Sequence, residues 1–184
     1  MKRVLITGAA SGMGLSASRL FADRGWTVMM ADLNDTEGRA RCAELLEEGL
    51  QNIHFHPCDV SDSASVKALH EQTMATLGGI DSIINNAAKG AVVNLTRAMA
   101  LDYGKYNIRV NNVCPSACAT PMFLANPADV VNQFNQANPL GRICTPQEVA
   151  EAMYFLASDA SRSCNGVNLP VSGGLELHTG QPVQ

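Results

Sequence analysis

The 184 residues and 19.5 kDa of this chain suffice for one substantial hydrophobic core and are too few for two domains of ordinary size. We therefore predict a single domain over residues 1–184. Apolar residues make up 46% of the chain and charged residues 16%, and no apolar run is long enough to cross a bilayer, so we expect no membrane partner. The net charge of -4, without a basic patch, argues against nucleic acid as a partner.

Strand-like and helix-like segments alternate through the first half of the sequence. Gly25, Gly49 and the Gly78-Gly79 pair are typical helix stops, and Ser61 is the expected N-cap of the third helix. We predict strands over residues 3–7, 27–32, 52–58 and 81–86, and helices over residues 14–24, 36–48, 61–77 and 89–103.

The second half is predicted to begin with a strand over residues 108–114. Four prolines then punctuate residues 115–140, for which we predict an irregular substrate loop with at most a short helix. Thr145-Pro146-Gln147-Glu148 has the features of a helix start, and that helix should run to about residue 158. A last strand over 167–171 completes the pattern. Such alternation predicts a doubly wound α/β fold with a parallel sheet.

The turn between the first strand and the first helix is rich in glycine. Gly8, Gly12 and Gly14 let the backbone turn tightly and approach a pyrophosphate, whose charge the N–H groups of the helix start would meet. Asp32 follows Gly14 by 18 residues, at the end of the second strand, where a carboxylate can bind an adenosine ribose. Because that charge would repel a 2′-phosphate, the pattern favours NAD(H) over NADP(H). The alternative is that Asp32 only caps the turn after it.

Asp59-Val60 comes directly after the third strand, at the edge where such folds form an adenine pocket. An alternative stays open here as well, because Asp59 and Ser61 are also typical turn and cap residues.

Several motifs together resemble the short-chain dehydrogenase/reductase family. They follow one another in the family's order and cover nearly the whole chain: Thr7-Gly-x3-Gly-x-Gly14, Asp59-Val60, Asn85-Asn86-Ala87, Lys89-Gly90-Ala91, Ile108 to Pro115, Thr120-Pro121-Met122 and Asn165 to Gly174. Within the family, residues 89–102 and Gly180-Gln181-Pro182 are most similar to bacterial meso-2,3-butanediol dehydrogenases, also called acetoin or diacetyl reductases.

The resemblance implies a Rossmann fold, NAD as cofactor and a small alcohol or ketone as substrate. It also implies a role for each matching residue. Gly8, Gly12, Met13 and Gly14 would line the pyrophosphate, Asp32 the ribose, Asp59 and Val60 the adenine, Asn86 and Lys89 the cofactor ribose, and Pro115 and Thr120 the nicotinamide. Relatives of this kind form dimers or tetramers, so a homo-oligomer is expected.

The family's catalytic tyrosine is missing. It precedes the lysine by four residues, a position that Asn85 occupies before Lys89, and Ala88 replaces the glycine of the family's Asn-Asn-Ala-Gly motif. Lys89 is thus the only catalytic residue that can be carried over. Tyr103 is no substitute, because 14 helical residues place it about 21 Å from Lys89. The catalytic serine, the family's fourth helix and its fifth strand have no counterpart either.

Two hypotheses follow. The first is an NAD-dependent oxidoreductase that interconverts a small secondary alcohol and its ketone, of the 2,3-butanediol/acetoin type; the downstream motifs favour it, with the 184 residues representing a shortened form of a complete enzyme. The second is a catalytically silent NAD-binding or assembly module. In that case strand 108–114 would either replace the lost neighbour of strand 81–86 or leave a slot in the sheet.

Two smaller expectations concern location and metals. The N-terminus leads straight into a strand without a signal-peptide core, and the six cysteines form no Cys-x-x-Cys pair, so we expect a cytoplasmic protein with reduced thiols. His54-x-His56 lacks a third ligand, so no metal is expected.

Overall fold

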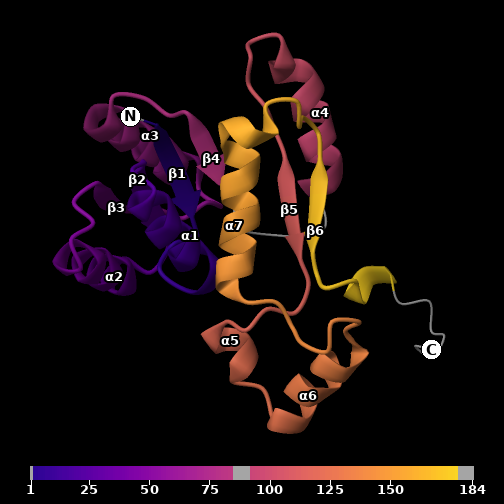
Figure 1. Cartoon of the computed structure of the whole chain (residues 1–184). Coiled ribbons are helices and arrows are strands. Elements are labelled where there is room, and N and C mark those ends of the chain that lie inside the picture. Colours follow the sequence, from indigo (N-terminus) through magenta and orange to yellow (C-terminus); the bar gives the residue numbers. More distant parts are fainter. Residues whose placement is uncertain (1, 85–91, 178–184) are drawn as a thin grey trace. The chain divides into compact units, whose positions relative to one another are not determined.

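The computed structural model describes residues 2–84 and 92–177 (Figure 1). The chain divides into two compact units, Met1–Ala87 and Ala88–Gln184. The single domain over 1–184 stays a prediction.

The first unit is a parallel sheet with helices on both faces (Figure 1). Its strand order is β3-β2-β1-β4, so the chain builds outward from β1 to β3 and then returns to the other side of β1. The elements are β1 (Arg3–Thr7), α1 (Gly12–Asp23), β2 (Thr27–Asp32), α2 (Asp35–Glu47), β3 (Ile53–Pro57), α3 (Ser63–Leu77) and β4 (Ser82–Ile84).

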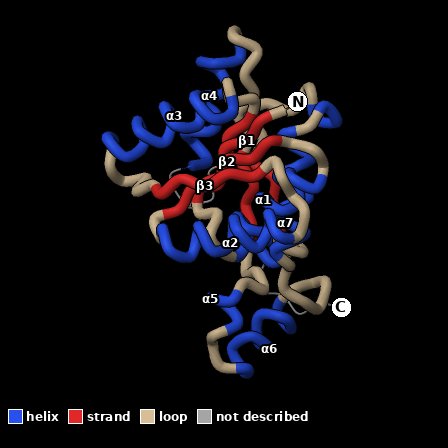
Figure 2. Tube along the Cα trace, turned by 90° about the vertical axis from the view of Figure 1, so that its left-hand side faces the viewer, coloured by secondary structure: helices blue, strands red, loops and turns tan. Residues whose placement is uncertain are grey.

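The return to β4 places α3 on the opposite face of this sheet from α1 and α2, because parallel crossovers are right-handed (Figure 2). Side chains alternate between the two faces along each strand. On the α3 face, Leu5 and Met29 pack with Leu69 in one buried cluster. Their neighbours Val4, Ile6 and Val28 are fully buried on the other face. The unit therefore has an apolar core on each face of its sheet. The carboxyl ends of its strands meet at one edge of that sheet.

Two predicted boundaries in this unit were wrong. The first helix begins at Gly12, two residues before the predicted start, so the helix includes part of the glycine turn. The third helix is capped by Asp62 and not by Ser61: the Asp62 carboxylate accepts hydrogen bonds from the N–H groups of Ala64 and Ser65. Asp62 has the extended backbone of an N-cap residue, whereas Ser61 is held by Asp59.

In the second unit, two strands form a parallel pair flanked in sequence by helices (Figure 1). Its elements are α4 (Val92–Gly104), β5 (Asn112–Pro115), α5 (Pro121–Leu124), α6 (Ala128–Ala137), α7 (Pro146–Ala157), β6 (Asn168–Val171) and two short 3₁₀ turns, Asp159–Ser161 and Leu175–Leu177. Strand β5 pairs with β6, in a register that runs from Asn112 opposite Asn168 to Pro115 opposite Val171.

Strand β5 is shorter than predicted and starts at Asn112. The preceding backbone is engaged elsewhere: the Val110 N–H donates to the Asn165 side chain, and the Val110 carbonyl accepts from the Gly166 N–H. These hydrogen bonds pair the polar backbone groups of Val110 without strand-to-strand pairing. The β-rich residues 108–111 therefore do not form a strand.

The prediction for residues 115–140 was also wrong, because the segment contains two helices. Pro121 and Pro127 lie at the starts of α5 and α6, where a missing N–H costs nothing. Phe123 of α5 and Phe134 of α6 stack edge to face with ring centroids 5.2 Å apart. No residue of either helix is buried, so the pair is anchored by its ends.

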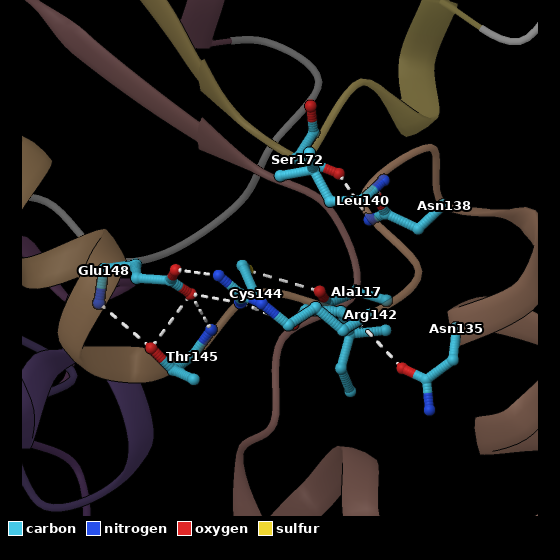
Figure 3. Close-up of polar contacts among 10 residues, drawn as sticks. Ala117, Asn135, Asn138, Leu140, Arg142, Cys144, Thr145, Glu148 and Ser172 are labelled. Atoms are coloured by element: carbon cyan, nitrogen blue, oxygen red, sulfur yellow. Dashed lines mark hydrogen bonds and ion pairs between the residues drawn. The ribbon is translucent and has the colours of Figure 1, made fainter.

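Helix α7 begins with the predicted capping box. The Thr145 hydroxyl accepts from the Glu148 N–H, and the Glu148 carboxylate accepts from the Thr145 N–H (Figure 3). Arg142 forms a two-pronged ion pair with the same carboxylate, with Nη2 2.6 Å from Oε1. These contacts, with the Arg142 hydrogen bonds contributing most, lower the pKa of Glu148 to about 2.

We expect Glu148→Gln to destabilise the protein by about 1 kcal/mol at pH 7, a value discounted because the side chain is 40% exposed. Since the folded-state pKa is lowered, the stabilisation is fully present above the ordinary value of 4.5 and is lost as the pH falls through about 2. Urea unfolding of both proteins from pH 7 to pH 2.5 should show their difference shrinking. Glu151→Gln on the same helix is the control, and an equal loss in both variants would contradict the prediction.

Within residues 2–84 and 92–177, no helix is long and apolar enough to cross a membrane. Four of the six cysteines are buried: Cys42, Cys58, Cys118 and Cys144.

Candidate cofactor site

The glycine turn leaves β1 at Thr7 and enters α1 at Gly12. Gly8 and Gly12 have φ angles of +63° and +53°, in the left-handed region that glycine adopts without strain. At Gly14 the constraint is steric: a Cβ atom would lie 2.8 Å from the carbonyl carbon of Gly8 and closer still to its oxygen. The turn is therefore folded back so tightly on the helix that only glycine fits at Gly14.

The start of α1 has the features of an anion site. Ser11 occupies the N-cap position with an extended backbone, and its side chain makes no capping hydrogen bond. The neighbouring helices differ, since the side chains of Asn34 and Asp62 cap α2 and α3. An anion placed against the first turn of α1 would meet backbone N–H groups and the positive end of the helix dipole.

Asp32 ends β2 beside this turn. One carboxylate oxygen, Oδ2, accepts from the Ala10 N–H at 2.9 Å, and the other, Oδ1, accepts from the Asn34 N–H at 3.0 Å. The residue therefore caps the turn after β2, as the alternative had it, and it also holds the glycine turn that follows the neighbouring strand β1. Its role at the ribose stays a prediction. Each oxygen has a further lone pair, so these bonds leave room for ribose hydroxyls.

Asp59 follows β3 on the same sheet edge, because Asp32 and Pro57 are register partners in β2 and β3. Its Oδ1 atom accepts from both the N–H and the hydroxyl of Ser61, at 2.8 and 2.7 Å. The hydroxyl bond contributes most to holding the pKa of Asp59 below its ordinary value. Asp59 is thus a turn residue, as the open alternative had it, while the neighbouring residue Val60 is 51% exposed at the same edge.

The first unit accordingly gathers Gly8, Gly12, Met13, Gly14, Asp32, Asp59 and Val60 at the carboxyl ends of β1 to β3. Asn86 and Lys89 lie outside the described residues, as does Asn85 at the tyrosine position. Pro115 and Thr120 belong to the second unit. Pro115 ends β5, and Thr120 is the N-cap of α5, where its hydroxyl accepts from the Phe123 N–H at 3.3 Å and can still donate to another acceptor.

Two contacts of this site were missed by sequence reasoning. Ala10 holds Asp32 through its backbone N–H, which no side-chain pattern reveals. Ser65, in the first turn of α3, accepts from the Asp59 N–H at 3.0 Å and so fixes the start of the Asp59 turn. The spacing of six residues between Asp59 and Ser65 offers no recognisable signal in a single sequence.

Two family profiles match the chain and together span most of it. The one described as short chain dehydrogenase matches residues 2–88, and the one described as enoyl-(acyl carrier protein) reductase matches residues 86–176. The boundary between the two matches lies at the Asn-Asn-Ala and Ala-Lys-Gly motifs.

Among curated proteins, the chain is 33% identical to meso-2,3-butanediol dehydrogenase of Serratia marcescens over 246 positions, covering 98% of this chain and 97% of that protein. It is 30% identical to L-fucose dehydrogenase of Oryctolagus cuniculus, covering 97% of this chain and 86% of that protein.

Two solved structures share the fold. The actinorhodin polyketide ketoreductase with NADPH has a TM-score of 0.88 at 22% identity, covering 96% of this chain and 98% of that one. The 3-ketoacyl-(acyl-carrier-protein) reductase of Brucella melitensis with NADH has a TM-score of 0.85 at 24% identity, covering 95% and 98%. The parallel-sheet α/β fold is thus Rossmann-like, and the chain belongs to the short-chain dehydrogenase family of oxidoreductases.

Proposed function

We propose that this chain binds NAD(H) at the glycine turn and belongs to an oxidoreductase that interconverts a small secondary alcohol and its ketone, of the 2,3-butanediol/acetoin type. The observation that carries the binding proposal is the cradle at Gly14, which a Cβ atom would fill. The substrate proposal rests on the 33% identity to a butanediol dehydrogenase over 98% of this chain.

Asp32 supports NAD(H) over NADP(H). Its carboxylate ends β2 and is tied to the glycine turn through Ala10, so a ribose bound along this turn would meet a fixed negative charge. Ribose hydroxyls donate hydrogen bonds to such a group, whereas a 2′-phosphate is repelled by it. Met13 would lie along the pyrophosphate and Val60 against the adenine.

The remaining site residues are proposed to bind the nicotinamide half of the cofactor. Lys89 and Asn86 would hold the second ribose, and Pro115 and the Thr120 hydroxyl would orient the nicotinamide, which accepts or donates the hydride when bound. Reduction of a ketone also requires a proton donor for the ketone oxygen. In this family the catalytic tyrosine has that role, and Lys89 alone does not replace it. The residue four positions before it is Asn85, and an amide is not an acid.

One observation favours the second candidate function, a catalytically silent NAD-binding module. The alignment with the butanediol dehydrogenase runs over 246 positions and this chain has 184 residues, so at least 62 positions have no residue in this chain. Both ends of the chain are matched, so the difference is internal. We therefore propose that the chain of 184 residues binds NAD(H) but does not catalyse the reaction. The complete enzyme, of which this chain would be a shortened form, would contain the catalytic serine and tyrosine.

The decisive experiment measures binding and turnover on the same preparation. Calorimetric titration with NADH and NADPH is expected to show tighter binding of NADH than of NADPH, and NADH oxidation with acetoin or diacetyl is expected to be absent. Turnover of either ketone would overturn the silent-module assignment for the 184-residue chain. Failure to bind NADH would overturn the whole proposal.

The Asp32→Asn variant tests how the cofactor is selected. We expect its NADH affinity to fall about tenfold, because the amide replaces a charged acceptor, and its discrimination against NADPH to shrink. If Asp32 only stabilised the turn, both cofactors would lose affinity equally. Asp35→Asn, an exposed carboxylate at the start of α2, is the matched control and should leave both affinities unchanged.

The predicted dimer or tetramer is kept as part of this proposal. A single monomeric species in sedimentation at micromolar concentration would count against it.

A further inference from the structure

Asn138 follows α6 directly and is only 3% exposed. Among the residues whose burial the structure describes, it is the only buried asparagine or glutamine. Burying an amide is costly unless it is hydrogen-bonded, so the partners of this side chain indicate what it does. Its Oδ1 atom accepts from the Leu140 N–H at 2.9 Å, and its Nδ2 atom donates to the Ser172 carbonyl at 2.8 Å (Figure 3). The amide therefore joins the end of α6 to a residue 34 positions away in the sequence.

The Ser172 carbonyl connects three segments of the second unit. Ser172 follows β6 directly and is itself buried. Its carbonyl oxygen also accepts from the hydroxyl of Ser116, the residue after β5, at 3.4 Å. A carbonyl oxygen has two lone pairs, so these two donors use both of them. Asn138 and Ser116 are thus held by one backbone oxygen.

The strand pair brings these groups together. Pro115 and Val171 are the last register partners of β5 and β6, and the Ser116 N–H donates to the Val171 carbonyl at 3.3 Å. Ser116 and Ser172 therefore leave the strand pair side by side. A displacement of the Ser172 carbonyl would act directly on the backbone that follows Pro115.

The turn after β6 fits closely around the Asn138 amide. Gly173 has a φ angle of +66°, in the left-handed region that favours glycine. A Cβ atom there would lie 2.9 Å from the Asn138 Cγ atom and closer still to both polar atoms of its amide. The conformation of this turn and the position of the amide therefore depend on each other.

We propose that Asn138 is a positioning residue for the nicotinamide half of the cofactor, an inference that rests on the proposed function. Pro115 is one of the two residues proposed to orient the nicotinamide, and Ser116 comes directly after it. By holding the Ser172 carbonyl, the Asn138 amide fixes the acceptor of the Ser116 hydroxyl and so the backbone at the end of β5. Asn138 acts through these groups and does not itself contact the cofactor.

The second residue proposed to orient the nicotinamide, Thr120, depends on Asn138 by another route. Thr120 is the N-cap of α5, so it begins the segment that contains α5 and α6. No residue of either helix is buried, so this segment depends on its ends for its position. The bond from Asn138 to Ser172 fixes the end that follows α6.

The test compares the affinities of the full chain for NADH and for ADP-ribose, which lacks the nicotinamide ring. By calorimetric titration, the wild type should bind NADH more tightly than ADP-ribose. We expect Asn138→Ala to lower NADH affinity about tenfold, the effect of one lost buried hydrogen bond, and to leave ADP-ribose affinity unchanged. Should Asn138→Ala fail to fold, Asn138→Asp tests the same bond at pH 8. It keeps the side-chain size and the acceptor for the Leu140 N–H, and an ionised carboxylate cannot donate to the Ser172 carbonyl.

Asn52→Ala is the matched control. The Asn52 amide also donates to backbone carbonyls, those of Ala22 and Trp26, and Asn52 precedes β3 in the first unit. Its loss should lower the melting temperature, as the loss of Asn138 does, and leave the ratio of the two affinities unchanged.

Ser116→Ala tests the route through the shared carbonyl. It removes the other donor to Ser172 and should lower the same affinity ratio. Its effect and that of Asn138→Ala should not add in the double variant, because both residues act through one oxygen. Additive effects on the ratio would contradict this route.

The results also separate the positioning role from the proposed function. Equal losses of NADH and ADP-ribose affinity in Asn138→Ala, or no loss of either, would overturn the positioning role. Equal affinities of the wild type for the two ligands would overturn it as well and leave NAD(H) binding at the glycine turn intact. A wild type that binds neither ligand would overturn the proposed function, and the positioning role with it.

Discussion

Gly14→Ala is expected to lower NADH affinity at least a hundredfold. The added Cβ atom would collide with the carbonyl group of Gly8, which is backbone and cannot rotate away as a side chain would. Either α1 moves off β1 or the glycine turn opens, and both displace the N–H groups that would meet the pyrophosphate. We also expect the protein to lose roughly 1–3 kcal/mol of stability, the usual cost of overpacking. Calorimetric titration and urea unfolding measure the two effects.

Gly104→Ala is the matched control for this change. Gly104 is the last residue of α4, and a Cβ atom there would make an ordinary contact 3.5 Å from the Asn165 amide nitrogen. Neither Gly14 nor Gly104 has a left-handed φ, so the comparison isolates steric collision from backbone strain. Wild-type affinity in Gly14→Ala, or an equal loss in both variants, would show that the turn does not bind the cofactor.

Phe21→Ala is expected to cost about 3–5 kcal/mol of stability, the largest stability effect among these predictions. Phe21 is fully buried and is the largest such side chain in the described residues. It packs edge to face against Trp26, with ring centroids 5.0 Å apart, and so holds the last turn of α1 against the segment that leads into β2. Truncation would leave a cavity that these rigid neighbours cannot fill.

Trp26 is the only tryptophan of the chain, so its fluorescence reports unfolding of this region, and circular dichroism reports the whole chain. Phe155→Ala, at a residue of α7 that is 41% exposed, is the control and should cost about 1 kcal/mol. Coincident transitions by the two probes would support the predicted single domain. A loss in Phe21→Ala no greater than in Phe155→Ala would contradict the assignment of Phe21 to the core.

Several elements of the fold could be predicted because their signals are local. Strands β1 and β2 match their predicted bounds, since each is a short β-rich run between polar or glycine boundaries. Helix α7 was recognised from Thr145 to Glu148, because a capping box is contained in four residues. Helix α6 was missed because Pro127 was taken as a breaker, whereas proline at a helix start is harmless.

In the candidate site, too, some residues could be predicted from the sequence and some contacts could not. Gly8, Gly12 and Gly14 were predictable, because positive φ angles and close approach require glycine wherever they occur. The hydrogen bond from Ala10 to Asp32 was not, because it joins residues 22 apart through a backbone N–H that every sequence contains.

The sequence by itself determined the alternation of strands and helices, the glycine turn and the acid at the end of β2, because each depends on the residues of one short segment. Only the tertiary structure decided what those residues do together. It showed that Asp32 holds the glycine turn and that Asp62 rather than Ser61 caps α3. The physical reason is that a local pattern specifies backbone conformation, whereas contacts between segments depend on how packing brings their atoms together.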